Sequence, residues 1–184
     1  MTITTTPLSG CFVFTPRIFN DDRGYFFESY NTRTFNDAAG AQINFVQDNQ
    51  SFSTKGVLRG LHLQTGPHAQ SKLVRVSQGE VLDVAVDLRK NSPTYGLHHA
   101  AILSDKNHSQ FFIPRGFAHG FVVLSDTAVF QYKCDNYYHK PSEGGLHYAD
   151  PSLAIDWSLP SAELLVSEKD RELPFLKDAG DFGF

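Results

Sequence analysis

The sequence predicts an all-β chain, folded as an antiparallel sandwich, jelly roll or barrel, and three observations support this prediction. Apolar and polar residues alternate with a period of two over residues 71–90. Phenylalanine occurs 16 times, whereas methionine and tryptophan occur once each, and with many valines, tyrosines and threonines this composition favours strands. Short apolar segments recur along the chain between turn-forming clusters at 21–24, 53–56, 104–107, 114–116 and 125–126.

The segment 71–90 is the clearest hairpin. Gly79 supplies the positive φ that a tight turn needs. The strand that follows is expected to have a single core face, on which Leu82, Val84, Val86 and Leu88 alternate with Asp83, Ala85 and Asp87. Further strands are expected within 10–16, 25–30, 43–50, 56–64, 98–104, 110–114, 120–125 and 128–134.

Helix signals occur in only two places. Residues 31–40 begin at Asn31, a suitable N-cap, and end at Gly40. Residues 167–170 have the form of a capping box before a proline, which predicts a short helical tail over about 167–184. Because the sequence contains no internal repeat, low-complexity tract or linker, residues 1–184 are expected to form one domain.

Charge and hydropathy limit the classes of partner. The formal net charge is −4, which gives no overall attraction to nucleic acid or to an anionic membrane. The N-terminus has no signal-peptide pattern and no apolar run approaches 18 residues, so we expect a cytoplasmic protein without membrane or nucleic-acid partners. Cys11 and Cys134 form no CxxC pair, and free thiols in a reducing compartment are expected.

Several expected strands carry more charge and amide than a buried face usually tolerates, which indicates a polar cavity between sheets. In GVLRGLHLQ, Arg59 and His62 are three residues apart, so a regular strand would point them to opposite faces. Gly60 permits a bulge that brings them into one cavity. A phosphate-binding arginine beside a catalytic imidazole and an edge arginine beside a core histidine are both compatible with this pattern.

Other candidates also have two interpretations. His119, between Gly116 and Gly120, fits either a turn or an imidazole that donates to a phosphate or a substrate oxygen. Tyr132 fits either packing or general-acid catalysis, and Asp170 fits a helix cap. No metal is expected, because the jelly-roll pattern HxH is broken at His62-Leu63-Gln64 and the adjacent His98 and His99 would point to opposite faces.

Five segments, taken in order, resemble the dTDP-4-dehydrorhamnose 3,5-epimerase family. They are DDRGYFFESY, QDNQSFSTKGVLRGLHLQ, AQSKLVRVSQGEVLDVAVDLRKNSPTYG, IPRGFAHGFVVLSDTAVFQYKCDNYY and SEKDRELP, within residues 10 to 176. The resemblance implies a cupin-like jelly roll without a metal or other cofactor. It also implies a homodimer that exchanges its N-terminal region, about 1–30.

The resemblance further implies a role for each matching residue. His62 matches the family's catalytic base, Asp170 its carboxylate partner, Tyr132 the acid of the opposite face and Lys72 the lysine near the C4 oxygen. Contacts to the nucleotide, diphosphate or sugar are implied for Arg23, Glu28, Gln47, Asn49, Arg59, His119, Tyr138, Glu143 and Lys169. In the dimer, Arg23 and Glu28 would serve the partner's pocket. Leu63 departs from the family's usual aromatic residue, and the C-terminal tail is short.

The implied reaction converts dTDP-4-dehydro-6-deoxy-D-glucose to dTDP-4-dehydro-L-rhamnose. Its chemistry agrees with the residues, because the C4 ketone acidifies C3 and C5 and an imidazole is a suitable base at neutral pH. Three alternatives remain. A mono-epimerase would act on C3 or C5 alone, a non-catalytic cupin would only bind the sugar nucleotide, and a metal-dependent cupin would catalyse a different reaction.

Overall fold

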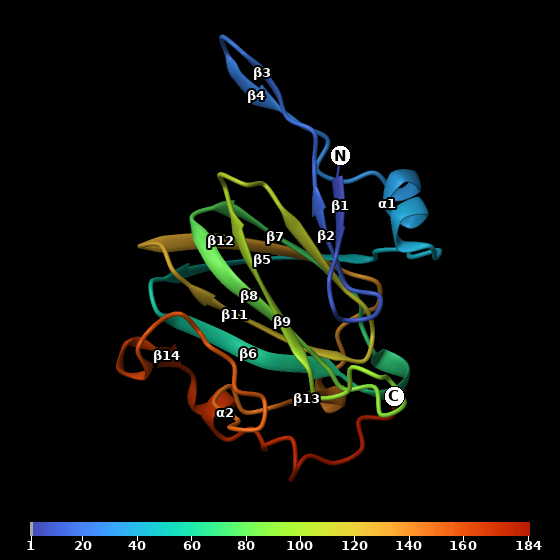
Figure 1. Cartoon of the computed structure of the whole chain (residues 1–184), viewed down its shortest axis with the longest axis vertical. Helices are drawn as coiled ribbons and strands as arrows, with labels where there is room; N and C mark the ends of the chain where they lie inside the picture. Colours follow the sequence, from blue (N-terminus) through green and yellow to red (C-terminus); the bar gives the residue numbers. More distant parts are fainter. Residues whose placement is uncertain (1) are drawn as a thin grey trace.

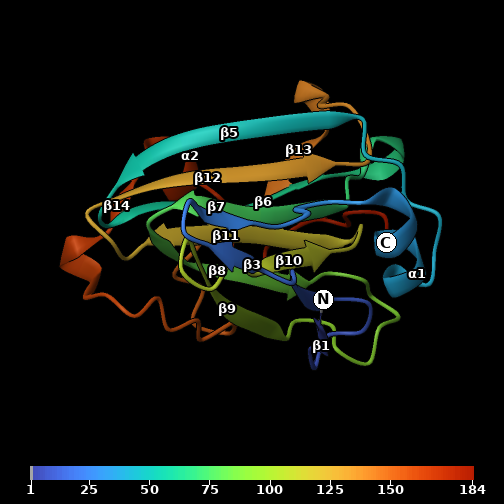
Figure 2. The same ribbon diagram turned by 90° about the horizontal axis from the view of Figure 1, so that it is seen from above.

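The computed structural model describes residues 2–184 and confirms the predicted all-β fold (Figures 1 and 2). One sheet has six strands in the order β1 (Thr2–Thr5), β2 (Phe12–Thr15), β10 (Gln110–Ile113), β7 (Lys72–Gln78), β12 (Thr127–Cys134) and β5 (Gln47–Thr54). The other has the order β13 (Glu143–Gly145), β6 (Val57–Gln64), β11 (Phe117–Val123), β8 (Glu80–Asp87) and β9 (His98–Ser104). The short strand β14 (Leu165–Val166) pairs with β6 in parallel.

A hairpin and three single 3₁₀ turns of residues 2–184 lie outside these sheets. The hairpin of β3 (Phe19–Asp21) and β4 (Gly24–Phe26) pairs only with itself and projects from the body of the molecule (Figure 1). Single 3₁₀ turns occur at Gly66–His68, Lys140–Ser142 and Ser161–Glu163. Within residues 2–184, no helix is long and apolar enough to cross a membrane.

Both predicted helices begin at the predicted caps, but the helical tail predicted over about 167–184 is only four residues long, and residues 172–184 form no helix. In α1 (Thr32–Ala39), the Asn31 side chain accepts hydrogen bonds from two backbone amides of the first turn, and Gly40 ends the helix in the left-handed region with φ 64°. In α2 (Glu168–Arg171), the Ser167 side chain accepts a hydrogen bond from the backbone amide of Asp170. This cap holds the backbone of Asp170 in place.

Buried apolar side chains of residues 2–184 form three clusters, whereas a single core face was expected for β8. One of them packs α1 against the first sheet and consists of Phe12, Phe14, Phe35, Leu73 and Phe112. The other two lie on the two faces of the second sheet. Between the sheets, Val74, Phe111 and Phe130 of the first sheet pack in one cluster with Val81 and Ala85 of the second. A second cluster covers the outer face of the second sheet, where β-strand residues contact the irregular C-terminal segment that passes below β6 in Figure 1.

The expectation that β8 has a single core face is therefore wrong. Val84 and Val86 belong to the outer layer with Leu153 and Trp157, whereas Ala85 faces the layer between the sheets. Every residue from Val81 to Asp87 is buried. The polar positions of the alternating pattern thus point into the sandwich rather than into solvent. Their aspartates must find partners there, because an unpaired buried charge is costly.

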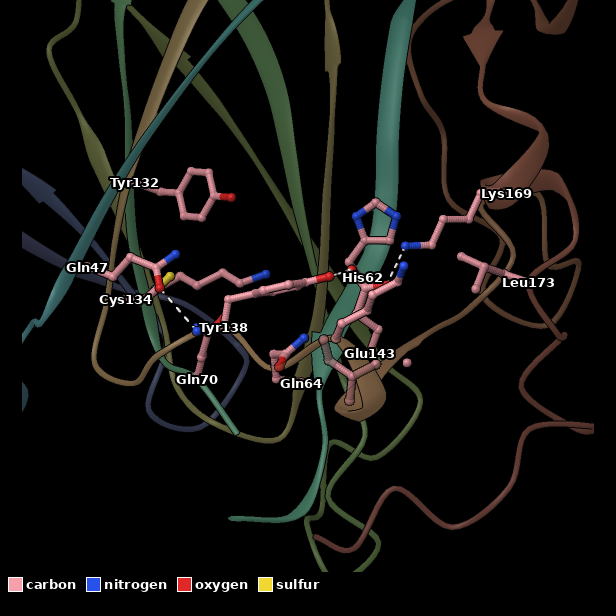
Figure 3. A pocket seen from close by; sticks show the side chains of 14 residues that line it. Gln47, His62, Gln64, Gln70, Tyr132, Cys134, Tyr138, Glu143, Lys169 and Leu173 are labelled. Carbon is pink, nitrogen blue, oxygen red and sulfur yellow. Dashed lines mark hydrogen bonds and ion pairs between the residues drawn. The ribbon is translucent and has the colours of Figure 1, made fainter. Parts of the chain in front are cut away.

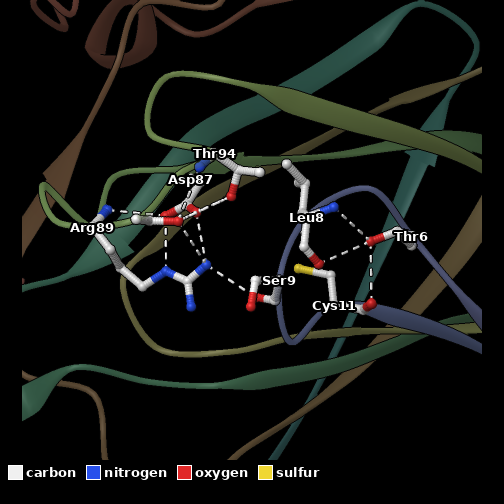
Figure 4. A network of polar contacts seen from close by, with 8 residues as sticks. Thr6, Leu8, Ser9, Cys11, Asp87, Arg89 and Thr94 are labelled. Carbon is white, nitrogen blue, oxygen red and sulfur yellow. Dashed lines mark hydrogen bonds and ion pairs between the residues drawn. The ribbon is translucent and has the colours of Figure 1, made fainter.

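Asp87, at the end of β8, is fully buried and has several such partners (Figure 4). Arg89 binds it through Nε and a terminal nitrogen at 2.8 and 2.7 Å, and also donates to the carbonyl of Ser9. The hydroxyls of Ser92 and Thr94 donate to the same carboxylate, each at 2.6 Å. Burial raises the pKa of Asp87, but the hydrogen bonds from Arg89, Ser92 and Thr94 outweigh it and lower the pKa to about 2.

The depressed pKa predicts a specific acid sensitivity. The ionised Asp87 stabilises the fold above the ordinary aspartate pKa, and this contribution disappears as the pH falls from about 4 through about 2. In urea unfolding measured over this range, Asp87→Asn should remove a pH-dependent contribution of about 2 kcal/mol. Equal pH slopes for the free energy of unfolding in the two proteins would contradict this account of the network.

Candidate active site

A polar cavity opens between the two sheets, as the sequence predicted (Figure 3). It consists of two adjoining hollows with volumes of about 380 and 420 Å³, within the range of small-molecule sites. The hollows share four residues: His62, Lys72, Tyr132 and Lys169.

β6 brings Arg59 and His62 to the same cavity through an irregularity at Gly60. Gly60 has φ 141°, and the pairing of β6 with β11 changes register between His119 and Phe121. A Cβ on Gly60 would lie 2.6 Å from the Cα of Gly120, so both strands need glycine where their backbones meet. The predicted bulge is confirmed. The interpretation of Arg59 and His62 as edge and core residues is wrong, because both line the second hollow.

His62 forms a dyad with a carboxylate from the C-terminal segment. Its Nε2 lies 2.7 Å from Oδ1 of Asp170, and the backbone amide of Gly60 donates to Oδ2 at 3.3 Å. Burial raises the pKa of Asp170, but its hydrogen bonds outweigh this effect and the pKa is lowered. The main cause of the lowering is His62, and the backbone amide of Gly60 and the side chain of Ser167 contribute less. A carboxylate only accepts hydrogen bonds, so Nε2 of His62 carries a proton and Nδ1 keeps the lone pair of a base.

The dyad is asymmetric in its exposure to solvent. The His62 side chain is 40% exposed, whereas that of Asp170 is 6% exposed. The imidazole can therefore meet a ligand in the cavity, while the carboxylate lies behind it, on a backbone that is held by the cap of α2. Such an arrangement fixes the ring orientation and stabilises the imidazolium that forms when the base takes a proton.

Lys72 and Tyr132 face His62 from the other sheet, on β7 and β12. Burial lowers the pKa of Lys72, while the nearby Cys134 and Asp83 act in the opposite direction. Burial also raises the pKa of Tyr132, as does Cys134, with Arg59 opposing. Tyr132 is therefore protonated at neutral pH. In Figure 3 its hydroxyl points into the cavity from the side opposite His62, so a base and an acid lie on the two walls.

A chain of hydrogen bonds forms the rim of the first hollow (Figure 3). The Tyr138 hydroxyl donates to Glu143 at 2.9 Å, and Nζ of Lys169 donates to the other carboxylate oxygen at 2.6 Å. The hydrogen bond from Lys169 is the main cause of a lowered pKa at Glu143. On the opposite side, Gln47 accepts from the backbone amide of Tyr138 and donates to the side chain of Asn49.

Ten of the thirteen predicted site residues line this cavity, and three do not. Arg23 lies in the turn of the projecting hairpin, where it pairs with Asp21, and Glu28 accepts from Asn31 beyond β4. Asn49 lies beside the cavity through its contact with Gln47. The predicted residues that line the cavity are His62, Lys72, Tyr132, Asp170, Gln47, Arg59, His119, Tyr138, Glu143 and Lys169.

His119 does not lie in a turn, which was one of its two interpretations. It sits inside β11, directly opposite His62 in the register and only 7% exposed. Its partner Asp83 was not recognised from the sequence, because the alternation in β8 made this aspartate one of the polar, outward positions. Gln64, Gln70, Cys134 and Lys140 also line the first hollow without having been predicted. Within residues 2–184, no group of three or more His, Cys, Asp or Glu residues converges to hold a metal.

The model of the dTDP-4-dehydrorhamnose 3,5-epimerase family matches residues 5–178. The chain belongs to this family. The dTDP-4-dehydrorhamnose 3,5-epimerase of Pseudomonas aeruginosa is 52% identical over 99% of both chains. The solved dTDP-4-dehydrorhamnose 3,5-epimerase of Elizabethkingia anophelis is 55% identical with a TM-score of 0.94, over 97% of both chains.

Family members with other ligands and specificities are also similar. An epimerase from Legionella pneumophila, solved in complex with dTDP-4-keto-L-rhamnose, is 48% identical with a TM-score of 0.93, over 97% of this chain and 94% of that one. A 3-epimerase of Streptomyces niveus is 38% identical over 96% of this chain and 84% of its own. A 3′-monoepimerase variant of Streptomyces bikiniensis, in complex with dTDP, is 29% identical with a TM-score of 0.88, over 95% and 87% of the two chains.

Arg59 lines the second hollow, where its Nε donates to the hydroxyl of Ser53 at 3.2 Å. The family resemblance implies that this arginine contacts the diphosphate. Arg59→Ala should therefore weaken binding of dTDP about ten- to a hundredfold in isothermal titration calorimetry, because charge-assisted hydrogen bonds are lost. Arg33→Ala, on the exposed surface of α1, should bind dTDP as the parent does. Unchanged affinity in Arg59→Ala would exclude this placement of the diphosphate.

Proposed function

We propose that this chain epimerises dTDP-4-dehydro-6-deoxy-D-glucose at C3 and C5, giving dTDP-4-dehydro-L-rhamnose. The observation that carries the proposal is the position of the His62–Asp170 dyad, which faces Tyr132 across one cavity. Epimerisation removes a proton from one face of a carbon and returns a proton to the other. A base and an acid on facing sheets meet this requirement without a redox step.

Each group has one task in the reaction. Nδ1 of His62 takes the proton from the carbon beside the ketone, and the electron pair of the C–H bond moves to the C4 oxygen. Asp170 stabilises the imidazolium, and the Lys72 ammonium stabilises the negative charge on the oxygen. Tyr132 then donates its phenolic proton to the opposite face of the carbon. Proton exchange with water restores the imidazole and the phenol before the second carbon reacts.

Sequence similarity favours epimerisation at both carbons over the mono-epimerase alternative. The 3,5-epimerases described above are 48–55% identical to this chain, whereas the 3-specific enzymes are 29–38% identical. The solved 3′-monoepimerase variant carries a histidine-to-asparagine and a tyrosine-to-phenylalanine substitution, spaced as His62 and Tyr132 are here. This supports the two residues as the reacting pair, and it also indicates that both specificities use them.

The remaining cavity residues are proposed to hold the sugar nucleotide. Arg59 and His119 line the hollow beside the dyad. Arg59 would bind the diphosphate, and His119 would bind the sugar. At the rim, the exposed ring of Tyr138 can stack on the base. Amide and charged groups around it would bind polar atoms of the nucleotide: Gln47, Asn49, Glu143 and Lys169.

We also propose a homodimer in which the β3–β4 hairpin reaches the partner's cavity. The hairpin exposes Phe19, Tyr25 and Phe26, each by more than half of its surface, and such apolar exposure indicates a contact with another molecule. Arg23 and Glu28 do not line the cavity of their own chain. They would complete the diphosphate and nucleotide contacts of the other protomer.

A cytoplasmic location is also part of the proposal. It is supported by two buried, unpaired cysteines, Cys11 and Cys134, because free thiols are typical of a reducing compartment.

Proton exchange tests the reaction directly. In deuterated water, NMR of dTDP-4-dehydro-6-deoxy-D-glucose should show deuterium at both C3 and C5. His62→Asn should slow both exchanges by about 10²- to 10⁴-fold, the usual contribution of a general base, while dTDP binding is retained. His139→Asn, at a histidine outside the two hollows, is the matched control and should exchange normally.

The outcomes separate the competing functions. Exchange at one carbon only would identify a mono-epimerase, and its absence from a protein that binds dTDP would leave a binding module. The same exchange after exhaustive chelation is expected, because no step requires a metal. Loss of exchange on chelation, restored by added metal, would favour the metal-dependent alternative.

The exchanged hairpin predicts complementation between two defective chains. Arg23→Ala and His62→Asn should each have low activity at subsaturating substrate. In a mixed dimer, the cavity of the Arg23→Ala chain receives the partner's intact hairpin and keeps its own His62. Co-refolding equal amounts should therefore restore about a quarter of wild-type activity, since about half of the dimers are mixed and each has one complete site. A mixture no more active than the average of its parents would contradict the exchange.

A further inference from the structure

Asp83 is a buried carboxylate beside the cavity that the proposed reaction does not use. It lies on β8, is fully buried, and touches the imidazole of His119 with both oxygens: Nε2 of His119 lies 3.1 Å from Oδ1 and 2.9 Å from Oδ2. The chain thus contains a second imidazole–carboxylate pair. Unlike the His62–Asp170 dyad, it is closed off from solvent on both sides, with side-chain exposures of 8% and 0%.

The strand register places this pair in line with the catalytic base. His119 lies opposite His62 on one neighbouring strand and opposite Ala85 on the other. Asp83 is two residues from Ala85 and so shares its face of the sheet. Asp83, His119 and His62 therefore follow one another across three adjacent strands, on the face that points into the sandwich.

Asp83 fixes the proton position on His119. A carboxylate only accepts hydrogen bonds, so Nε2 of His119 carries the proton that is shared with Asp83. Burial lowers the pKa of His119, with Asp83 opposing and Lys72 and His62 lowering it further, so the ring is neutral near pH 7. Nδ1 of His119 is then left as an acceptor, suited to a sugar hydroxyl rather than to a phosphate oxygen.

Asp83 also acts on Lys72 across the sandwich. Lys72 forms no ion pair with any residue from 2 to 184, and burial lowers its pKa, so its charge depends on nearby anions. Two groups oppose the effect of burial on Lys72, Cys134 and Asp83, and burial raises the pKa of the Cys134 thiol to about 11. Asp83 is the only carboxylate of the two. The other titratable groups on the facing strands are His62, His119, Arg59 and Tyr132.

We propose that Asp83 is a positioning residue of the reaction, which holds His119 as the Nε2–H tautomer and keeps Lys72 charged beside the C4 oxygen. This inference rests on the proposed function. Through Lys72, Asp83 would determine how much positive charge meets the developing oxyanion. Through His119, it would determine which substrate group the ring can bind. Neither effect requires Asp83 to touch the substrate.

Asp83→Asn tests the effect on Lys72, because asparagine keeps the size of the side chain and an oxygen that accepts from His119. Without the negative charge, Lys72 should lose its proton more easily. The basic limb of the kcat/KM profile, which reports groups of the free enzyme, should then move to lower pH by about one unit. At neutral pH, kcat should fall about ten- to a hundredfold, with the affinity for dTDP nearly unchanged.

Asp87→Asn is the matched control, because Asp87 lies on the same strand and face, is equally buried and is outside the cavity. It should leave the basic limb at the wild-type pH. An unmoved basic limb in Asp83→Asn would overturn the proposal, and so would an equal displacement in both variants, since that would reflect general loosening of the strand.

A measurement on the wild-type protein keeps the proposal testable even if Asp83→Asn does not fold. Long-range ¹H–¹⁵N correlation spectra of the histidine rings should show His119 as the neutral Nε2–H tautomer near pH 7. An Nδ1–H ring or a doubly protonated ring would overturn the proposal. Absence of exchange in the wild-type protein would instead contradict the proposed function, and the tautomer measurement would be unaffected.

Discussion

The hydrogen bond between His62 and Asp170 is the interaction on which the cavity depends, and it joins residues 108 positions apart in the sequence. His62 is fixed by β6, in the middle of a sheet. Asp170 belongs to a four-residue helix at the end of an irregular segment. A helix this short is not stable by itself, so the apolar layer under the second sheet must hold it. Leu153, Trp157 and Leu164 form that layer with residues of β6, β8 and β11.

The two-sheet construction also determines the chemistry that the cavity can support. The second sheet contributes His62 and His119, and the first contributes Lys72 and Tyr132. A flat ligand between the sheets would present one face to each. A reaction that moves a proton from one face to the other is therefore a natural use of this fold. In the proposal above, the buried Asp83 of β8 then keeps the Lys72 cation charged in a dry interior.

Local signals in the sequence predicted much of the fold, because strand alternation, helix caps and turn glycines depend on neighbouring residues. The caps at Asn31 and Ser167 and the bulge at Gly60 are examples. Residue chemistry alone left His62 and Tyr132 with two interpretations each, and the resemblance was needed to select one. Asp83 was missed for a physical reason. The alternation in β8 sets Asp83 and Asp87 on the face opposite Leu82, Val84 and Val86. It contains no information on whether solvent or a second sheet covers that face.

The irregular segment that carries Asp170 has a consequence for how this enzyme would respond to heat. Its regular pairing with the sheet is limited to the two residues of β14, whereas β6, β11 and β8 are joined along most of their length. Segments with few backbone hydrogen bonds open at a lower free energy than the body of a domain. Partial detachment here would withdraw the carboxylate from His62 while both sheets stayed intact. Catalysis would then cease before circular dichroism recorded any loss of strand structure.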